Sequence, residues 1–261
     1  MWSVVGLVVL VGFVVFLRSF ARVLAYPGSP LAFADVGLRG SRTRLLPFRT
    51  EDGLNLRAAW VSSGAAGAKV AVFFHGNAES AAQNLPLASA LADGGVDAVL
   101  AEYRGYGGQA GSPDEAGLYA DGAALLGALA SQGVTASRLV LVGRSLGTGV
   151  AVEMALRTPP SLLVLVSPYT SLPDLGRSLV GPLAPLVVPD RFDNLGKIAK
   201  LTCPVVILHG TRDEVVPFRM GEALARAGKG VRFVPLEGRT HNDIPDLAAR
   251  LLEEIRRGGG G

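Results

Sequence analysis

Short apolar runs recur along the chain, and segments long enough for helices separate them. The runs are four to six residues long and stand at 70–74, 98–101, 139–142, 162–166, 205–208 and 231–236. Continuous apolar runs of this length are typical of strands buried on both faces of a parallel sheet. The expected helices lie between and after these runs, at 80–92, 114–131, 146–157, 219–227 and 243–257.

This alternation predicts the fold class. Strand–helix–strand units make neighbouring strands parallel and cover both faces of the sheet with helices. A polar turn at 51–53, flanked by extended segments, precedes the first unit. We therefore expect one α/β domain over 25–257 with a mostly parallel central sheet, followed by a glycine tail at 258–261.

The segment 167–202 is too long for an ordinary connection, and we expect it to form a small lid or cap. Its aliphatic side chains are consistent with three roles: lining an acyl pocket, touching a bilayer, or packing an ordinary helix on the domain. These alternatives stay open. The side chains concerned are Leu179, Val180, Leu183, Leu186, Val187 and Val188.

The first 17 residues contain no charged side chain. A helix of that length spans about 26 Å, near the lower limit for crossing a bilayer. We expect residues 1–24 to form a single-pass membrane anchor, and the arginines that follow it to place the domain in the cytoplasm. A signal peptide cleaved near Val23-Leu24-Ala25 and a buried helix are the alternatives.

The charges are unevenly distributed. The chain is 49% apolar and 18% charged, which excludes a disordered or fibrous protein. Its net charge is +3, but residues 1–50 hold six arginines and a single acidic residue, Asp35, whereas the other 211 residues carry 19 basic and 21 acidic side chains. The basic character therefore belongs to the N-terminal segment, where it favours anionic membrane lipid as a partner and not nucleic acid.

The pentad Gly143-Arg144-Ser145-Leu146-Gly147 stands between a predicted strand and a predicted helix. A serine at such a sharp turn lies at a helix N-terminus, where backbone amides stabilise an oxyanion. We expect Ser145 to be a nucleophile and the amide of Leu146 to be one oxyanion donor. The second donor is expected at Asn77, directly after the strand at 70–74. The alternative is an accidental glycine cluster, because 34 of the 261 residues are glycine.

A serine nucleophile needs a base that is oriented by an acid. His75 and His209 each end an apolar strand and precede glycine, as loop-shaping residues do. The third histidine, His241, lies between the last strand and the last helix and is the candidate base. Asp213 follows the strand at 205–208 and is the candidate acid. Glu214 competes for this role, and capping of the next helix is another role open to Asp213.

The sequence predicts no cofactor and no metal ion. A single cysteine, Cys203, excludes an internal disulfide, and with three dispersed histidines it provides no metal-ligand spacing. Cys203 itself is expected to be a small buried hydrophobic residue. The glycines at 103–107 lack the following lysine and hydroxyl residue of a phosphate-binding loop.

Five motifs follow one another in a fixed order: HGNA at 75–78, YRGYG at 103–107, GLYxD at 117–121, GRSLG at 143–147 and THND at 240–243. With these motifs the chain resembles the α/β-hydrolases, and specifically a membrane-anchored branch of serine hydrolases, from about residue 20 onward. The resemblance implies a catalytic triad with Ser145 as nucleophile, Asp213 as acid and His241 as base. It also implies Asn77 and Leu146 as oxyanion donors.

Two positions depart from the pattern of that branch. Glu102 stands where an aspartate is usual, which we expect to alter a structural contact. Arg239 lengthens the turn before Thr240-His241, which we expect to shift the base.

On this resemblance we expect a membrane-anchored serine hydrolase that cleaves esters or thioesters of lipophilic acids through an acyl-enzyme. An amidase or peptidase with the same triad is one alternative, because acyl transfer does not identify the leaving group. A non-catalytic, membrane-tethered scaffold with the hydrolase fold is the other.

Overall fold

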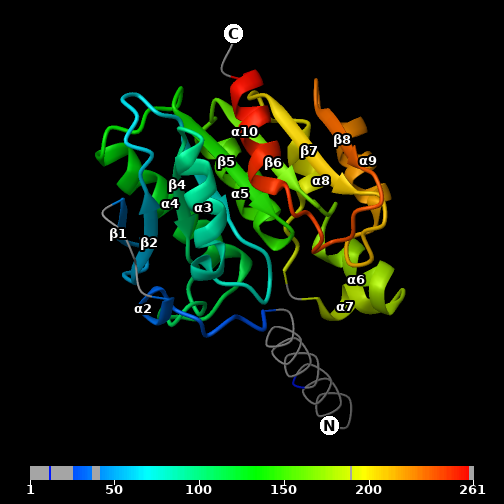
Figure 1. Ribbon diagram of the computed structural model, residues 1–261. Helices are drawn as coiled ribbons and strands as arrows, with labels where there is room; N and C mark the ends of the chain where they lie inside the picture. Colours follow the sequence, from blue (N-terminus) through cyan, green and yellow to red (C-terminus); the bar gives the residue numbers. More distant parts are fainter. Residues whose placement is uncertain (1–11, 13–25, 37–41, 189, 259–261) are drawn as a thin grey trace.

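The computed structural model describes residue 12 and residues 26–36, 42–188 and 190–258 (Figure 1). The expected anchor at 1–24, residue 12 apart, and the glycine tail beyond Gly258 lie outside the described residues. Within the part of the chain that is described, no helix is both long enough and apolar enough to cross a membrane.

An eight-stranded sheet lies at the centre of the domain, with the strand order β1-β2-β4-β3-β5-β6-β7-β8. The strands from β3 to β8 are parallel, and β1 and β2 add an antiparallel edge beside β4. The strands are β1 (Thr43–Arg49), β2 (Asn55–Val61), β3 (Val70–Phe74), β4 (Asp97–Ala101), β5 (Leu139–Arg144), β6 (Leu162–Val166), β7 (Val205–Gly210) and β8 (Arg232–Leu236).

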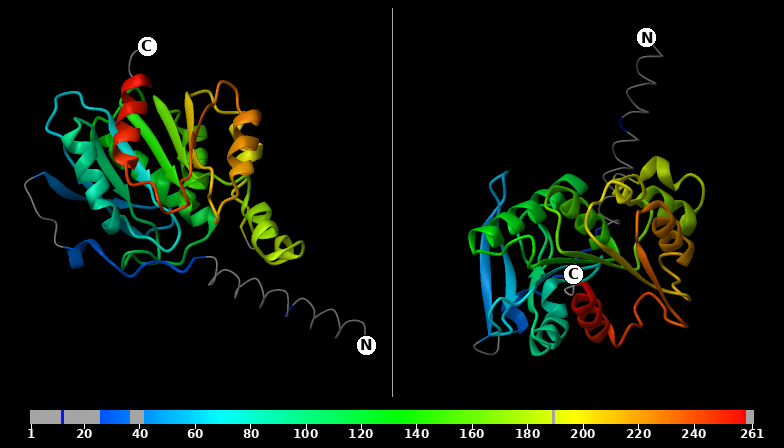
Figure 2. Two further views of the ribbon diagram at one scale, coloured as in Figure 1. Left: turned by 45° about the vertical axis from the view of Figure 1, so that its right-hand side comes forward. Right: turned by 90° about the horizontal axis from the view of Figure 1, so that it is seen from above.

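Helices cover both faces of this sheet (Figure 2). One face carries α3 (Leu85–Asp93) and α10 (Leu247–Gly258). The other face carries α4 (Glu115–Ser131), α5 (Leu146–Arg157), α8 (Asn194–Ile198) and α9 (Phe218–Ala227). The remaining helical segments are α2 (Phe33–Val36), the 3-10 helix η1 (Ala81–Asn84), α6 (Leu172–Val180) and α7 (Ala184–Val187).

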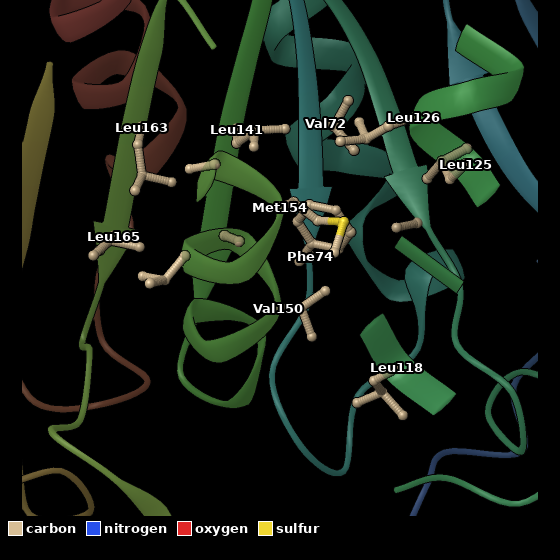
Figure 3. Packing of buried hydrophobic residues seen from close by; sticks show 14 of the residues in the cluster. Val72, Phe74, Leu118, Leu125, Leu126, Leu141, Val150, Met154, Leu163 and Leu165 are labelled. Carbon is tan, nitrogen blue, oxygen red and sulfur yellow. The ribbon is translucent and has the colours of Figure 1, made fainter. Parts of the chain in front are cut away.

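The core is built where α5 packs on the middle strands (Figure 3). Val72 and Phe74 of β3 and Leu141 of β5 are fully buried together with Val150 and Met154 of α5. Every residue of β3, β4 and β6 is buried, because helices lie on both of their faces. This double burial explains the uninterrupted apolar runs in the sequence.

The predicted fold class, a mostly parallel sheet with helices on both faces, is confirmed. Two helices begin later than predicted. The segment at 80–92 opens with η1, and its α-helix starts only at Leu85, because Pro86 lacks the amide that would continue a helix from the preceding turn. The helix expected from residue 243 starts at Leu247, because Pro245 disfavours a helical backbone at Ile244.

The segment 167–202 divides into two parts. The helices α6 and α7 lie toward the carboxyl ends of the strands, below α8 and α9 in Figure 1, whereas α8 packs against α5 and α9 on one face of the domain. The role of this segment as a lid stays a prediction.

A buried arginine joins two of the sequence motifs. Nε and Nη2 of Arg104 donate to Oδ1 of Asp121 at 2.9 and 2.7 Å, and its amide donates to Oδ2 at 2.9 Å. The two side chains are 8% and 2% exposed. A Cβ atom at Gly117 would lie 2.7 to 2.9 Å from Arg104, so the glycine leaves room for the guanidinium. These contacts fix α4 to the loop after β4.

The guanidinium of Arg104 also binds a second carboxylate, at the surface. Its Nη1 and Nη2 donate to Asp52 at 2.6 and 3.1 Å. These hydrogen bonds lower the pKa of Asp52 to about 2, whereas burial raises the pKa of Asp121. The two aspartates thus bind the same cation in very different surroundings.

Asp121→Ala should lower the free energy of unfolding by about 3 to 5 kcal/mol, because it removes the buried carboxylate that pairs with the guanidinium. Urea unfolding followed by circular dichroism measures the loss. Asp52→Ala is the matched control and should cost much less, because water replaces an exposed carboxylate. The small contribution of Asp52 needs its ionised form, so it should be lost as the pH falls from about 4 toward about 2. Equal losses for the two variants would contradict this account of the network.

Candidate active site

Ser145 lies at the turn between β5 and α5. Its backbone has a φ of +48°, a value that residues other than glycine rarely adopt. The amide of Ser145 donates to the carbonyl of Val166 at 3.0 Å. Its carbonyl accepts from the amide of Thr148 at 2.9 Å and from the Thr148 hydroxyl at 2.6 Å. These bonds hold the serine in its strained conformation at the N-terminus of α5.

The glycines of the pentad are required by the close crossing of strand and helix. A Cβ atom at Gly147 would lie 2.0 Å from the carbonyl oxygen of Phe74 at the end of β3. A Cβ atom at Gly143 would lie 2.6 Å from the carbonyl oxygen of Gly147 and 2.7 Å from Cα of Thr148. Backbone atoms cannot give way to a side chain at these distances. The pentad is therefore not an accidental cluster of glycines.

A chain of hydrogen bonds connects Ser145 to two residues from other loops. Nε2 of His241 lies 3.1 Å from Oγ of Ser145. Nδ1 of His241 lies 3.0 and 2.9 Å from the two carboxylate oxygens of Asp213. The imidazole is almost completely buried. The loops after β5, β7 and β8 thus bring together the three residues that the sequence singled out, although they are far apart along the chain.

The turn that Arg239 lengthens does not move His241 out of reach of Ser145. The carbonyl of Arg239 accepts from the amide of Arg212 at 3.0 Å, and its amide donates to the carbonyl of Leu236 at 3.2 Å. The longer turn is therefore tied to the neighbouring loop. The expected shift of the base stays a prediction, and the contact between His241 and Ser145 is present.

The carboxylate of Asp213 is held by several donors. Oδ1 accepts from the amides of Val215 and Val216 at 3.0 and 2.7 Å. Burial raises the pKa of Asp213, but hydrogen bonds from His209 and His241 outweigh burial and hold that pKa well below its ordinary value. The carboxylate is therefore ionised at neutral pH, as it must be to orient and stabilise a protonated imidazole.

The two alternatives for the acid position can be judged from the same contacts. The carboxylate of Glu214 accepts from the backbone amide of His241 at 3.3 Å and does not reach the ring in any hydrogen bond of the described residues. The residue that caps α9 is Pro217, not Asp213. Both observations leave Asp213 as the partner of the imidazole.

The sequence did not indicate a contact between His209 and the acid. His209 is fully buried, and its Nε2 lies 2.9 Å from the carbonyl of Val216 and 3.4 Å from Oδ2 of Asp213. It therefore packs behind the carboxylate and helps to fix it. The only signal in the sequence is the spacing of four residues between His209 and Asp213 at the end of one strand.

His75 shapes the neighbouring loop, as expected. Its Nδ1 lies 2.8 Å from the carbonyl of Gly76, and its Nε2 lies 2.9 Å from Oε1 of Glu102. Oε2 of Glu102 accepts from the amide of Ala81 at 3.0 Å. The glutamate that replaces the usual aspartate thus makes a buried structural contact beneath the loop after β3.

The loop after β3 lies alongside Ser145. A Cβ atom at Gly76 would be 3.4 Å from Cβ of Ser145, an ordinary contact distance, so the two segments are neighbours. The next residue, Asn77, accepts a hydrogen bond from the Tyr106 hydroxyl through its side-chain oxygen at 2.7 Å. Leu146 occupies the first turn of α5, where amides have no acceptor within the helix. Both expected oxyanion donors therefore belong to segments that adjoin Ser145.

Arg144 joins the loop after β3 to the loop that carries His241, a role that the sequence did not indicate. Its Nη1 pairs with Oε1 of Glu79 at 2.6 Å. Its Nη2 donates to Oδ1 of Asn242 at 2.9 Å and to the carbonyl of His241 at 3.5 Å. Oε2 of Glu79 in turn accepts from the amide of Gly76 at 3.4 Å. We call Arg144, Glu79 and Asn242 the arginine bridge.

The expectation for Cys203 is met, since this residue is buried and not part of a disulfide. Burial raises the pKa of its thiol. Among the described residues, no group of three or more histidine, cysteine, aspartate and glutamate side chains is placed to hold a metal ion.

A strained serine after β5, with partners supplied by the loops after β7 and β8, is the arrangement of the α/β-hydrolases. The similarity of the chain to known proteins supports the same class. The chain is 37% identical to the uncharacterized protein Rv2307c of Mycobacterium tuberculosis, over 97% of this chain and 93% of that protein. It is 34% identical to the alpha/beta hydrolase domain-containing protein 17C of Xenopus tropicalis, over 80% of this chain and 67% of that protein. The chain therefore belongs to the α/β-hydrolase superfamily.

A family model supports the same class, and solved structures have a similar fold. The family described as serine aminopeptidase, S33 matches residues 66–191. An esterase of Pyrococcus furiosus superposes with a TM-score of 0.69 at 19% identity, over 89% of this chain and 98% of that chain. An alpha-beta hydrolase of Vibrio vulnificus gives a TM-score of 0.71 at 22% identity, over 87% and 84%. These structural matches share the fold.

Arg144→Met should slow the reaction of Ser145 with a fluorophosphonate probe by about 10- to 100-fold, because the loops that carry His241 and Asn77 lose their common anchor. The second-order labelling rate measures the effect, and circular dichroism checks the fold. Arg157→Met is the matched control on α5. Arg157 pairs with Glu153 away from the serine, so this variant should label like the unmodified chain. Labelling of Arg144→Met at the unmodified rate would show that the arginine bridge does not position the site.

Proposed function

We propose that this protein is a serine hydrolase that cleaves carboxylic ester or thioester bonds of lipophilic acyl substrates. The observation that carries the proposal is the chain of hydrogen bonds from Oγ of Ser145 through His241 to Asp213. A serine hydroxyl is a weak nucleophile until a neighbouring base accepts its proton. His241 is within hydrogen-bond distance of that proton, and the ionised Asp213 holds the ring in place.

In the proposed mechanism, Oγ of Ser145 attacks the acyl carbonyl while Nε2 of His241 accepts the hydroxyl proton. The amides of Leu146 and Asn77 stabilise the negative charge on the carbonyl oxygen of the tetrahedral intermediate. His241 then donates the proton to the leaving alcohol or thiol, and the acyl group remains on Ser145. A water molecule, deprotonated by His241, releases the acid and restores the serine.

The lipophilic substrate class is supported by two apolar features that lie outside the catalytic residues. Leu183 and Leu186 are 72% and 69% exposed on the segment toward the carboxyl ends of the strands. The uncharged residues 1–17 fit the membrane-anchored branch of the superfamily, with residues 1–24 as the anchor and the catalytic domain in the cytoplasm. In this arrangement the enzyme meets acyl groups that are held in a membrane.

An amidase or peptidase is the second candidate, and the family described as serine aminopeptidase, S33 favours it. The same triad acts on both bond types, since only the leaving group differs. Values of kcat/KM for nitrophenyl esters of increasing chain length, set against matched anilides, separate the two. The proposal expects rates that rise with acyl chain length on esters and low rates on anilides.

Ser145→Ala should abolish labelling of the full chain by a fluorophosphonate probe and abolish ester hydrolysis, because no other group takes the place of the nucleophile. In-gel fluorescence and a chromogenic ester assay measure the two losses. Ser131→Ala, at an exposed serine that ends α4, is the matched control and should keep both activities. If the unmodified chain reacts no faster than Ser145→Ala, the protein is a non-catalytic scaffold and the proposal fails.

Asp213→Asn should lower kcat by about 10³- to 10⁴-fold, because an amide does not stabilise the protonated imidazole. Glu214→Gln is the matched control. Its amide oxygen still accepts from the backbone of His241, so activity should stay within a few-fold of the unmodified chain. Since the pKa of Asp213 is held low, no step in the unmodified pH–rate profile above about pH 5 should belong to it. The reverse ranking of the two variants would assign the acid to Glu214.

A further inference from the structure

Four large aliphatic side chains are strongly exposed within eight consecutive positions, in α6, in α7 and in the turn between them. Leu179, Val180, Leu183 and Leu186 are 52%, 80%, 72% and 69% exposed. Scattered exposed leucines are ordinary, but an exposed apolar cluster marks an interaction surface. We call these four side chains the α6–α7 patch.

The patch belongs to the end of the domain that carries Ser145. The segment that leads to it starts at the end of β6, where Tyr169 donates through its hydroxyl to the carbonyl of Leu146, next to the serine, at 3.2 Å. Ser171 then caps α6 by accepting from the amide of Asp174 at 3.2 Å. Figure 1 shows α6 and α7 toward the carboxyl ends of the strands, below α8 and α9. The segment that carries the patch is therefore anchored at its start beside the candidate active site.

The first described segment of the domain contacts the chain that follows α7. The hydroxyl of Tyr26 donates to Oδ2 of Asp190 at 2.7 Å, and both side chains are buried. Asp190 stands three residues after the end of α7. The chain thus enters the domain beside α7, and the uncharged residues 1–17 precede this point in the sequence by only a short stretch. The start of the described domain is therefore tied to the segment that follows α7.

Three arginines lie between α6 and α9, and one of them, Arg177, stands two residues before Leu179 of the patch. A cavity of about 350 Å³ between α6 and α9 is lined by Arg177, Arg219 and Arg226, with Asp174 as its only acidic residue. Arg177 pairs with Asp174, and Arg219 donates to the Ser178 hydroxyl at 2.8 Å. Exposed aliphatic side chains next to arginines match the two layers of a membrane surface, the acyl chains and the anionic headgroups.

We propose that the α6–α7 patch inserts into the surface of a bilayer that contains anionic lipid, with the arginines of α6 and α9 at the level of the headgroups. The candidate active site then opens toward the membrane. A second copy of this chain is a poorer occupant, because it would bring two sets of arginines together. This docking goes beyond the proposed function and does not depend on the hydrolytic chemistry.

Site-specific fluorescence on the full chain tests the proposal. Cys203→Ala removes the one cysteine, and Leu183→Cys then places an environment-sensitive fluorophore in the patch. The matched control is Ser131→Cys, at the exposed end of α4. The chain is added to vesicles of phosphatidylcholine with a minor fraction of phosphatidylserine, with and without nitroxide-labelled lipid. We expect a blue shift and nitroxide quenching at position 183, neither at position 131, and weaker quenching without phosphatidylserine.

Two results would overturn the proposal. A fluorophore at position 183 that keeps its emission in buffer shows that the patch stays in water. A blue shift without quenching by nitroxide lipid shows that protein covers the patch, as in a dimer. The same experiment on Ser145→Ala should give the unmodified result, so that failure of docking and failure of the hydrolase proposal are distinguishable.

A second set of variants tests the patch by its effect on rate. Leu179→Ser, Leu183→Ser and Leu186→Ser combined should lower the rate on an acyl ester held in vesicles by more than about tenfold, because the apolar area that enters the bilayer is lost. The rate on a short water-soluble ester should stay unchanged. Leu195→Ser, at the exposed leucine of α8, is the matched control and should alter neither rate. Equal rates of the triple variant and the control on vesicles would contradict docking through the patch.

Discussion

The close crossing of α5 over the ends of β3 and β5 is the constraint on which the rest of the site depends. Gly147 lets the helix approach the carbonyl of Phe74, and Gly143 leaves room for the first turn of α5. The chain between them must turn sharply, which forces Ser145 to a φ of +48°. The same crossing places Ser145 at the first turn of α5, where amides have no acceptor within the helix. Packing of the core and placement of Ser145 thus have one cause.

Around this turn, a few charged side chains fix the loops through specific contacts. Asp213 is ionised in a buried setting because two histidines and two backbone amides donate to it. Arg144 is a cation that contacts both the loop after β3 and the loop after β8, two loops that no strand pairing connects. Buried charges are expensive unless they are paired, so these contacts leave each loop few alternative arrangements. A hydroxyl and an imidazole held 3.1 Å apart need such restriction to react together.

Much of this could be predicted from the sequence because it rests on local pattern. Apolar runs identify the buried strands, and the pentad between strand and helix identifies Ser145. Contacts that depend on loop geometry could not be predicted. Arg144 and Asn242 lie 98 positions apart, and nothing local in either residue indicates the other. Glu214 and Asp213 are adjacent and chemically alike, so only the direction of their side chains separates them. The late start of α10 at Leu247 follows from Pro245. This local signal was outweighed by the helical pattern of the residues around it.

The central claim is that Ser145 carries the acyl group of the substrate during turnover. Acid quenching of the full chain with a nitrophenyl ester within the first turnovers, followed by mass spectrometry of its peptides, tests this claim directly. The account predicts an adduct with the mass of the acyl group on the peptide that contains Ser145, formed as nitrophenol is released. An adduct on a different residue, or continued hydrolysis by Ser145→Ala, would contradict it.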